Sequence, residues 1–96
     1  MNRNGPIIIV EDDKEDQELL KEALAELQIE NEIILFIDAE EALEFLLYTQ
    51  VEPFIILSDV NMPKIGGVEL RRRLQCHNDI RVQSVPYIFL TTSAEN

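Results

Sequence analysis

The sequence predicts an α/β fold in which an open parallel sheet carries helices on its faces. Short runs of apolar, mostly β-branched residues alternate with longer segments in which leucine and alanine recur every three or four residues. Strands that alternate with helices form parallel sheets with right-handed crossovers. Because the apolar runs show no polar alternation, we expect strands that are buried on both faces. The expected order is three strand–helix units and a fourth strand, within a single domain of residues 1–96.

The chain is small and strongly acidic. A domain of 96 residues holds one core, since it buries only a little over ~60% of its unfolded surface. Eight Lys and Arg against 19 Asp and Glu give a net charge of −11, which disfavours nucleic acid and membrane as direct partners. The sequence has no recognisable signal peptide or run of spanning length, and its single cysteine, Cys76, suits a reducing compartment. We therefore expect a cytoplasmic protein.

The first half of the chain predicts two strand–helix units. Residues 7–10 form the first apolar run, and three acidic residues follow it at once. A helix is expected over 14–28, with Asp13 as its N-cap. The second strand is expected over 32–37, and Asp38 is expected to cap the next helix in an approximate capping box with Glu41. The residues expected on the buried side of that helix are Ala42, Leu43, Phe45, Leu46 and Leu47.

The central strand is expected at residues 54–57 and leads into Asp59. Pro63 prevents the strand from continuing, and the Gly66-Gly67 pair is expected to permit an unusual backbone. Asp59 therefore lies at the carboxyl edge of the sheet, where open α/β sheets bind their ligands.

A third helix and a fourth strand complete the predicted fold. The helix is expected from about Gly67 through Gln75, and the strand over 86–90, ending in Thr91-Thr92-Ser93. On that helix we expect Val68, Leu70 and Leu74 to point inward and Arg71, Arg72 and Arg73 to point outward.

Polar side chains from three strand ends are expected to meet at one edge: Glu11 and Asp12, then Asp59, then Ser93. Clustered carboxylates repel one another unless a cation lies between them. Mg²⁺ suits such a site, because it takes one or two carboxylates together with a carbonyl oxygen and water. A carboxylate beside Mg²⁺ can act as a nucleophile towards phosphorus, and the Ser93 hydroxyl could donate a hydrogen bond to a phosphoryl oxygen. The sequence thus predicts phosphoryl transfer to Asp59.

Three motifs resemble the receiver domain of two-component response regulators. They are Ile-Val-Glu-Asp-Asp at 9–13, Asp-Val-Asn-Met-Pro at 59–63 with Gly67 following, and Leu-Thr-Thr-Ser-Ala at 90–94. The resemblance implies a flavodoxin-like fold. It also implies that Asp59 is the phosphoacceptor, that Glu11 and Asp12 are the acid pair, and that the backbone carbonyl of Asn61 binds Mg²⁺. By the same resemblance, Ser93 is the hydroxyl switch and Ala94 the small residue after it.

The resemblance also implies segments that this sequence does not contain. Family members continue with a helix, a fifth strand bearing a lysine that pairs with the phosphoacceptor, and a last helix. Since the sequence ends at Asn96, we expect an incomplete receiver, and neither Lys21 nor Lys64 matches the lysine by motif. An exposed fourth strand could be covered by self-association through the sheet edge.

Simpler roles are open for the same residues. The acids at 11–13 could only favour a helix N-terminus, and Asp59 or Ser93 could only cap the turn or helix that follows. His77 is expected to be a surface residue and Cys76 a packing residue at a helix end.

Three function classes follow from these residues. The leading one is a receiver that takes a phosphoryl group from a histidine kinase or phosphotransfer protein and signals to an unknown output partner by a conformational change, without being a turnover enzyme. The second is a Mg²⁺-dependent phosphohydrolase with an aspartyl-phosphate intermediate, but such enzymes commonly carry a second acid where this chain has Asn61. The third is an interaction module that keeps the fold and is never phosphorylated.

Overall fold

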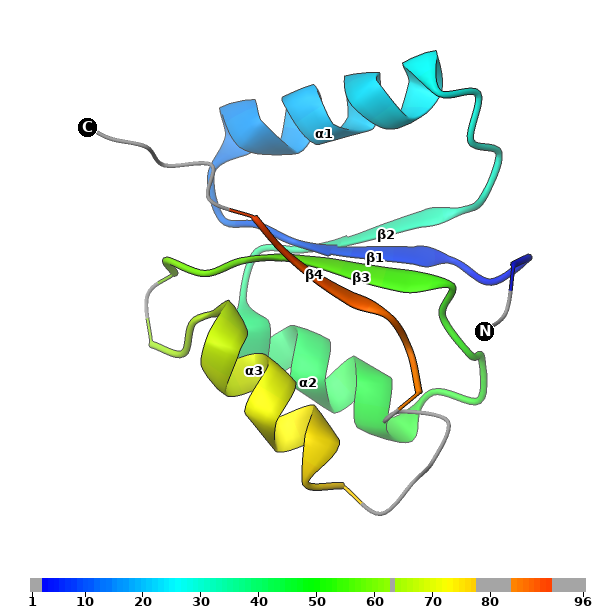
Figure 1. The fold of residues 1–96 in the computed structure, drawn as a ribbon. Coiled ribbons are helices and arrows are strands. Elements are labelled where there is room, and N and C mark those ends of the chain that lie inside the picture. Colours follow the sequence, from blue (N-terminus) through cyan, green and yellow to red (C-terminus); the bar gives the residue numbers. More distant parts are fainter. Residues whose placement is uncertain (1–2, 63, 78–83, 91–96) are drawn as a thin grey trace.

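The computed structural model describes residues 3–62, 64–77 and 84–90, and within them strands and helices alternate (Figure 1). The elements are β1 (Ile7–Val10), α1 (Lys14–Glu26), β2 (Ile33–Phe36), α2 (Ala39–Tyr48), β3 (Ile55–Asp59), α3 (Gly67–Gln75) and β4 (Tyr87–Leu90). All strand pairs are parallel, and the order across the sheet is β2-β1-β3-β4. The predicted α/β architecture is confirmed.

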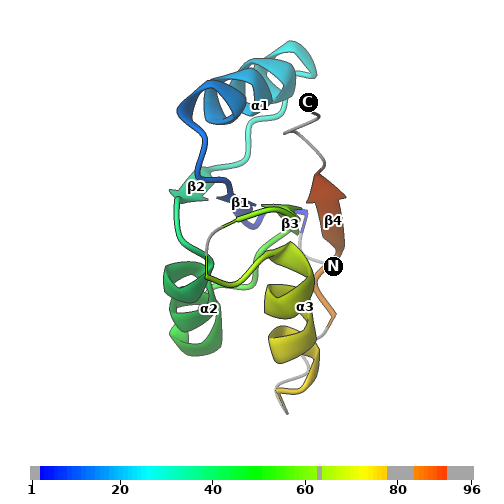
Figure 2. The same cartoon turned by 90° about the vertical axis from the view of Figure 1, so that its left-hand side faces the viewer.

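The sheet separates two unequal helical layers (Figure 2). Helix α1 covers one face, and α2 and α3 lie side by side on the other. Successive side chains of a strand point to opposite faces, so Ile7 and Ile9 of β1 pack in the layer that contains Leu20 and Leu24 of α1, whereas Ile8 packs against the other layer. The residues of β1 are completely buried, as the uninterrupted apolar run predicted.

The strand register brings the ends of β1, β2 and β3 to the same height. Val10 pairs with Phe36 on one side and with Ser58 on the other. The Glu11 N–H then donates to the Phe36 carbonyl oxygen at 2.9 Å, which extends the ladder by one step. Glu11 and Asp59, each one residue beyond this paired level, therefore lie together at the carboxyl edge of the sheet.

Several expected positions differ in the structure. Helix α1 ends at Glu26 and not at Gln28, whose φ of 59° is incompatible with a right-handed helix. Val68 is 62% exposed and does not point inward. It lies two residues from Leu70, about 200° around the helix, so both cannot face the sheet. Cys76 is exposed at the end of α3 and is not a packing residue.

Strand β4 is the least covered element of the described sheet. Ile88 and Phe89 are adjacent, so they point to opposite faces, and they are 45% and 39% exposed. Among the described residues, β4 pairs only with β3. The described helices are all too short or too polar to cross a lipid bilayer.

Candidate metal and phosphoryl site

Three carboxylates meet at the carboxyl edge of the sheet. One oxygen from each of Glu11, Asp12 and Asp59 lies within 4.8 Å of the other two. Glu11 and Asp59 are 0% and 2% exposed, whereas Asp12 is exposed to solvent. The structure therefore brings together the three acidic side chains that the sequence predicted, and it buries two of them.

The chemistry of this cluster fits a hard divalent cation. Two carboxylates buried side by side repel each other, and a cation between them removes that cost. All the side-chain ligand atoms on offer are oxygens, which suits Mg²⁺ and not the softer metals that prefer nitrogen or sulfur. The exposed Asp12 leaves one side of the cluster open to solvent, so water ligands and an incoming phosphoryl group have access.

Glu11 is held by the start of α1. The Gln17 side-chain amide donates to the Glu11 carbonyl oxygen at 2.7 Å, and this hydrogen bond is buried. The Asp13 N–H donates to Glu11 Oε2 at 3.0 Å, while the Asp13 carboxylate caps α1 by accepting from the N–H groups of Glu15 and Asp16. The predicted N-cap is confirmed. Gln17 was not anticipated, although a polar residue on the inward side of a helix is a signal that could have indicated it.

Asp59 is held by the turn that follows β3. Its Oδ1 atom accepts a hydrogen bond from the Asn61 N–H at 3.0 Å, and its carbonyl oxygen lies 3.3 Å from the Ser58 hydroxyl. This turn fixes one carboxylate oxygen of Asp59 and places Asn61 beside the cluster. The role of the Asn61 carbonyl as a metal ligand remains a prediction.

Gly66 and Gly67 are required by close contact and not by an unusual backbone. Among the described glycines none has a positive φ, so the expected conformational role is wrong. A Cβ atom at position 67 would lie 2.5 Å from the Asp59 carbonyl oxygen and 2.8 Å from Ser58 Oγ. The first residue of α3 therefore lies directly against the backbone of Asp59.

Tyr87 links β4 to the first residue of α3, which lies against Asp59. Its hydroxyl donates to the Gly67 carbonyl oxygen at 3.0 Å, and burial raises the pKa of the Tyr87 phenol to about 12. The sequence analysis placed Tyr87 in a strand but gave it no role at the site. A tyrosine at the start of an apolar strand is the available signal, because its hydroxyl requires a partner when it is buried.

Lys64 joins the loops after β2 and β3. Its φ is 67°, and its ammonium group lies 3.2 Å from Asp38 Oδ2 and 3.9 Å from Glu40 Oε1. Asp38 also caps α2, as predicted, by accepting from the Glu40 N–H. That hydrogen bond and the nearby ammonium group lower the pKa of Asp38, and the Asp38 carboxylate raises the pKa of Lys64.

The structure does not describe every residue considered in the sequence analysis. Ser93 and Ala94 are outside the described residues, as is Pro63. His77 is half-buried just after α3, and its N–H donates to the Leu74 carbonyl oxygen at 3.2 Å.

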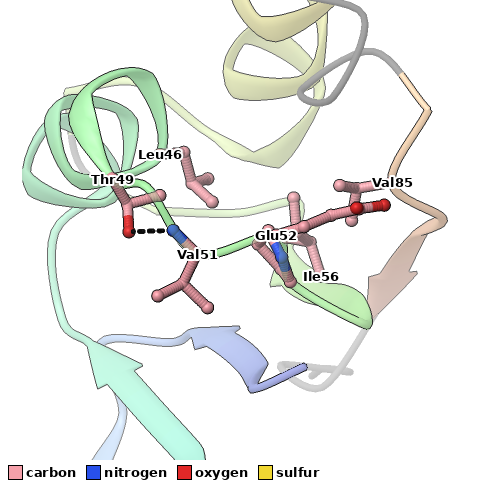
Figure 3. Close-up of a pocket in the computed structure, with 7 residues that line it drawn as sticks. Leu46, Thr49, Val51, Glu52, Ile56 and Val85 are labelled. Atoms are coloured by element: carbon pink, nitrogen blue, oxygen red, sulfur yellow. Dashed lines mark hydrogen bonds between the residues drawn. The ribbon is translucent and has the colours of Figure 1, made fainter. Parts of the chain in front are cut away.

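A small hollow lies at the opposite end of the sheet, near the start of β3 (Figure 3). Its volume is about 10 Å³, the space of about one water molecule, and Leu46, Val51 and Val85 contribute to its lining. Val51 is held there by a hydrogen bond from its N–H to the Thr49 hydroxyl. This hollow is too small for a substrate. The acidic cluster is the candidate functional site because it gathers three carboxylates at the strand ends.

Comparison with known proteins agrees with this geometry. The response regulator receiver domain family matches residues 7–96. Response regulator Rcp1 of Synechocystis sp. (strain ATCC 27184 / PCC 6803 / Kazusa) is 34% identical over 92 residues, covering 91% of this chain and 61% of Rcp1.

Two solved structures extend the comparison. The bacteriophytochrome response regulator RtBRR has 33% identity and a TM-score of 0.83 over 93% of this chain and 57% of its own. The phosphorylated cyanobacterial phytochrome response regulator RcpA has 31% identity and a TM-score of 0.79 over 96% and 68%. The chain thus spans about three fifths of the length of Rcp1 and RtBRR. With an acidic cluster at the strand ends and this match over nearly all its length, the chain belongs to the response regulator receiver domain family.

Proposed function

We propose that this chain is a phosphoacceptor that takes a phosphoryl group onto Asp59 from a histidine kinase or a phosphotransfer protein. The observation that carries the proposal is the cluster of Glu11, Asp12 and Asp59, in which a buried carboxylate at a strand end lies beside two further acids. Membership of the receiver family and the likeness to RcpA, which was solved in a phosphorylated form, support it.

In the proposed reaction a carboxylate oxygen of Asp59 attacks the phosphorus atom of the donor. A P–O bond forms to Asp59, and the bond from phosphorus to the donor breaks, its electron pair leaving with the donor. Glu11, Asp12, Asp59 and the Asn61 carbonyl would hold Mg²⁺, which when bound neutralises charge on the transferring group. The Asn61 N–H keeps the Asp59 carboxylate oriented, and we propose that Ser93 donates to a phosphoryl oxygen.

The same site favours a switch over a turnover enzyme. A phosphohydrolase that works through an aspartyl-phosphate needs a second acid to protonate the leaving group and then activate water. The residue two positions after Asp59 is Asn61, whose side chain does neither. We therefore propose a phosphoryl state that persists long enough to be recognised by an output partner.

The exposed side chains of β4 support one further partner, a second copy of the chain. Ile88 and Phe89 flank an edge that is unpaired within the described sheet. Sedimentation velocity over a range of protein concentrations tests this, and a monomer throughout that range would contradict self-association.

The phosphoacceptor is tested by intact mass spectrometry. The folded chain is incubated with Mg²⁺ and a small acyl phosphate, beside Asp59→Asn and beside Asp12→Asn as a variant that keeps the nucleophile. We expect a phosphoryl adduct on the wild type, none on Asp59→Asn, and a slower reaction of Asp12→Asn. An adduct that persists in Asp59→Asn would place the chemistry elsewhere. A wild-type chain that binds Mg²⁺ without forming an adduct would favour the interaction module.

A further inference from the structure

The ion pair between Lys64 and Asp38 joins the loop after β3 to the start of α2. Lys64 follows β3 and Asp38 follows β2, but β2 and β3 are not neighbours, because β1 lies between them. Helices α2 and α3, which follow these two loops, lie side by side on one face of the sheet, so the contact joins the two loops at that face (Figure 2).

Lys64 is also close in sequence to the residue that orients the phosphoacceptor. Three positions separate it from Asn61, whose N–H holds Asp59 Oδ1. Its left-handed backbone costs energy for a residue that is not glycine. The ammonium group contacts the carboxylates of Asp38 and Glu40 at the start of α2, which offsets that cost when the loop after β3 is in this conformation.

We propose that Lys64 and Asp38 form a strap that positions the loop after β3, and that this strap raises the affinity of the acidic cluster for Mg²⁺. The proposal rests on the metal site proposed above. Lys64 is a positioning residue in this scheme. It holds the turn in which Asn61 orients Asp59, so the ligands are arranged before the metal arrives.

The strap and a purely electrostatic effect of Lys64 predict opposite changes in Mg²⁺ affinity for Lys64→Gln. Replacing Lys64 by glutamine removes a cation near the cluster, so an effect of charge alone would strengthen Mg²⁺ binding. Loss of a strap weakens it instead, because the loop must then be ordered when the metal binds. Asp38→Asn gives the complementary variant, since asparagine keeps the helix cap but loses the charge that pairs with Lys64.

The test is a double-mutant cycle on Mg²⁺ affinity, measured by calorimetry on the wild type, Lys64→Gln, Asp38→Asn and the double variant. Since one exposed ion pair is lost, we expect each single change to weaken binding by about two- to five-fold. We expect the double variant to be no weaker than the single ones, because they break the same contact. Lys21→Gln is the matched control, because it removes the same charge and an exposed ion pair with Glu18 that lies within α1.

Hydrogen exchange at the Asn61 amide gives a readout that needs neither metal nor activity. We expect faster exchange in Lys64→Gln and no change in Lys21→Gln. Unchanged exchange together with tighter Mg²⁺ binding in Lys64→Gln would overturn the strap while leaving the metal site intact. A wild-type chain that binds no Mg²⁺ would overturn the metal site itself, and with it the effect of the strap on affinity.

Discussion

At the scale of single residues, the position of Asp59 depends on close packing around its backbone. Gly67 lies against its carbonyl oxygen, and the Tyr87 hydroxyl holds Gly67 from the neighbouring strand. Both contacts involve backbone atoms and not the Asp59 carboxylate. Substitutions here should therefore change stability and the geometry of the site together.

Gly67→Ala should destabilise the fold by about 1 to 3 kcal/mol, because the added methyl group has no room between Asp59 and Ser58. Urea denaturation measures the change. Val68→Ala is the control on the same helix, and since Val68 is largely exposed we expect a change within about 0.5 kcal/mol. Equal effects of the two substitutions would show that α3 can shift away from β3.

Tyr87→Phe removes the hydrogen bond to Gly67 and should cost about 1 kcal/mol at neutral pH. The pH dependence has a definite sign. Burial raises the pKa of Tyr87 from 10.0 to about 12, so the unfolded chain loses the phenolic proton first and stability falls as the pH rises from 10 to 12. Unfolding curves across that range should therefore bring the wild type closer to the variant. A gap that stays constant with pH would contradict the burial of the phenol.

At the scale of elements, the side-chain caps of α1 and α2 are both linked to segments that follow the strands at the site edge. Asp13 caps α1 with its side chain and donates its N–H to Glu11, so the start of α1 and a candidate ligand are fixed together. Asp38 caps α2 with its side chain and also accepts a hydrogen bond from Lys64, in the loop after β3.

Asp13→Ala should destabilise the protein by about 1 kcal/mol through loss of the cap, whereas Asp13→Asn should be nearly neutral because asparagine caps equally well. Thermal or urea unfolding of both variants distinguishes the cap from the charge. If Asp13→Asn were as unstable as Asp13→Ala, the negative charge and not the hydrogen bonds would matter.

The sequence predicted this level of structure well because its signals are local. Uninterrupted runs such as residues 7–10 have few alternatives to a buried strand, and Asp13 lies directly before a helical pattern. Val68 was misplaced because an apolar residue in the first turn of a helix gives little information about the face it will occupy. The Lys64–Asp38 pair was missed because its partners are 26 residues apart and meet only once the strand order is known.

At the scale of the whole molecule, the net charge of −11 and two buried carboxylates work against folding when no cation is bound. A metal ion bound at the site would therefore raise the free energy of unfolding. Such an arrangement couples the occupancy of the site to the global stability of the fold.

Mg²⁺ should raise the free energy of unfolding of the wild type, by about 2.7 kcal/mol when its concentration is 100 times the Kd. Without the metal, Asp59→Asn should be more stable than the wild type, by about 1 to 2 kcal/mol, because it removes one of two buried like charges. Urea titrations with and without Mg²⁺ test both statements. If Mg²⁺ raised the free energy of unfolding of Asp59→Asn as much as that of the wild type, Asp59 would be excluded as a ligand.

The acidic cluster at the sheet edge has a further consequence for the proposed reaction, because its negative field acts on any phosphoryl donor that approaches. A small anionic donor approaches this edge against the field of the cluster and of the whole chain, so added salt should accelerate its reaction. A protein donor with a basic docking surface is attracted by the same field, and salt should slow it. If the chain has the proposed function, its negative charge thus disfavours a free anionic donor relative to a protein donor with a basic docking surface.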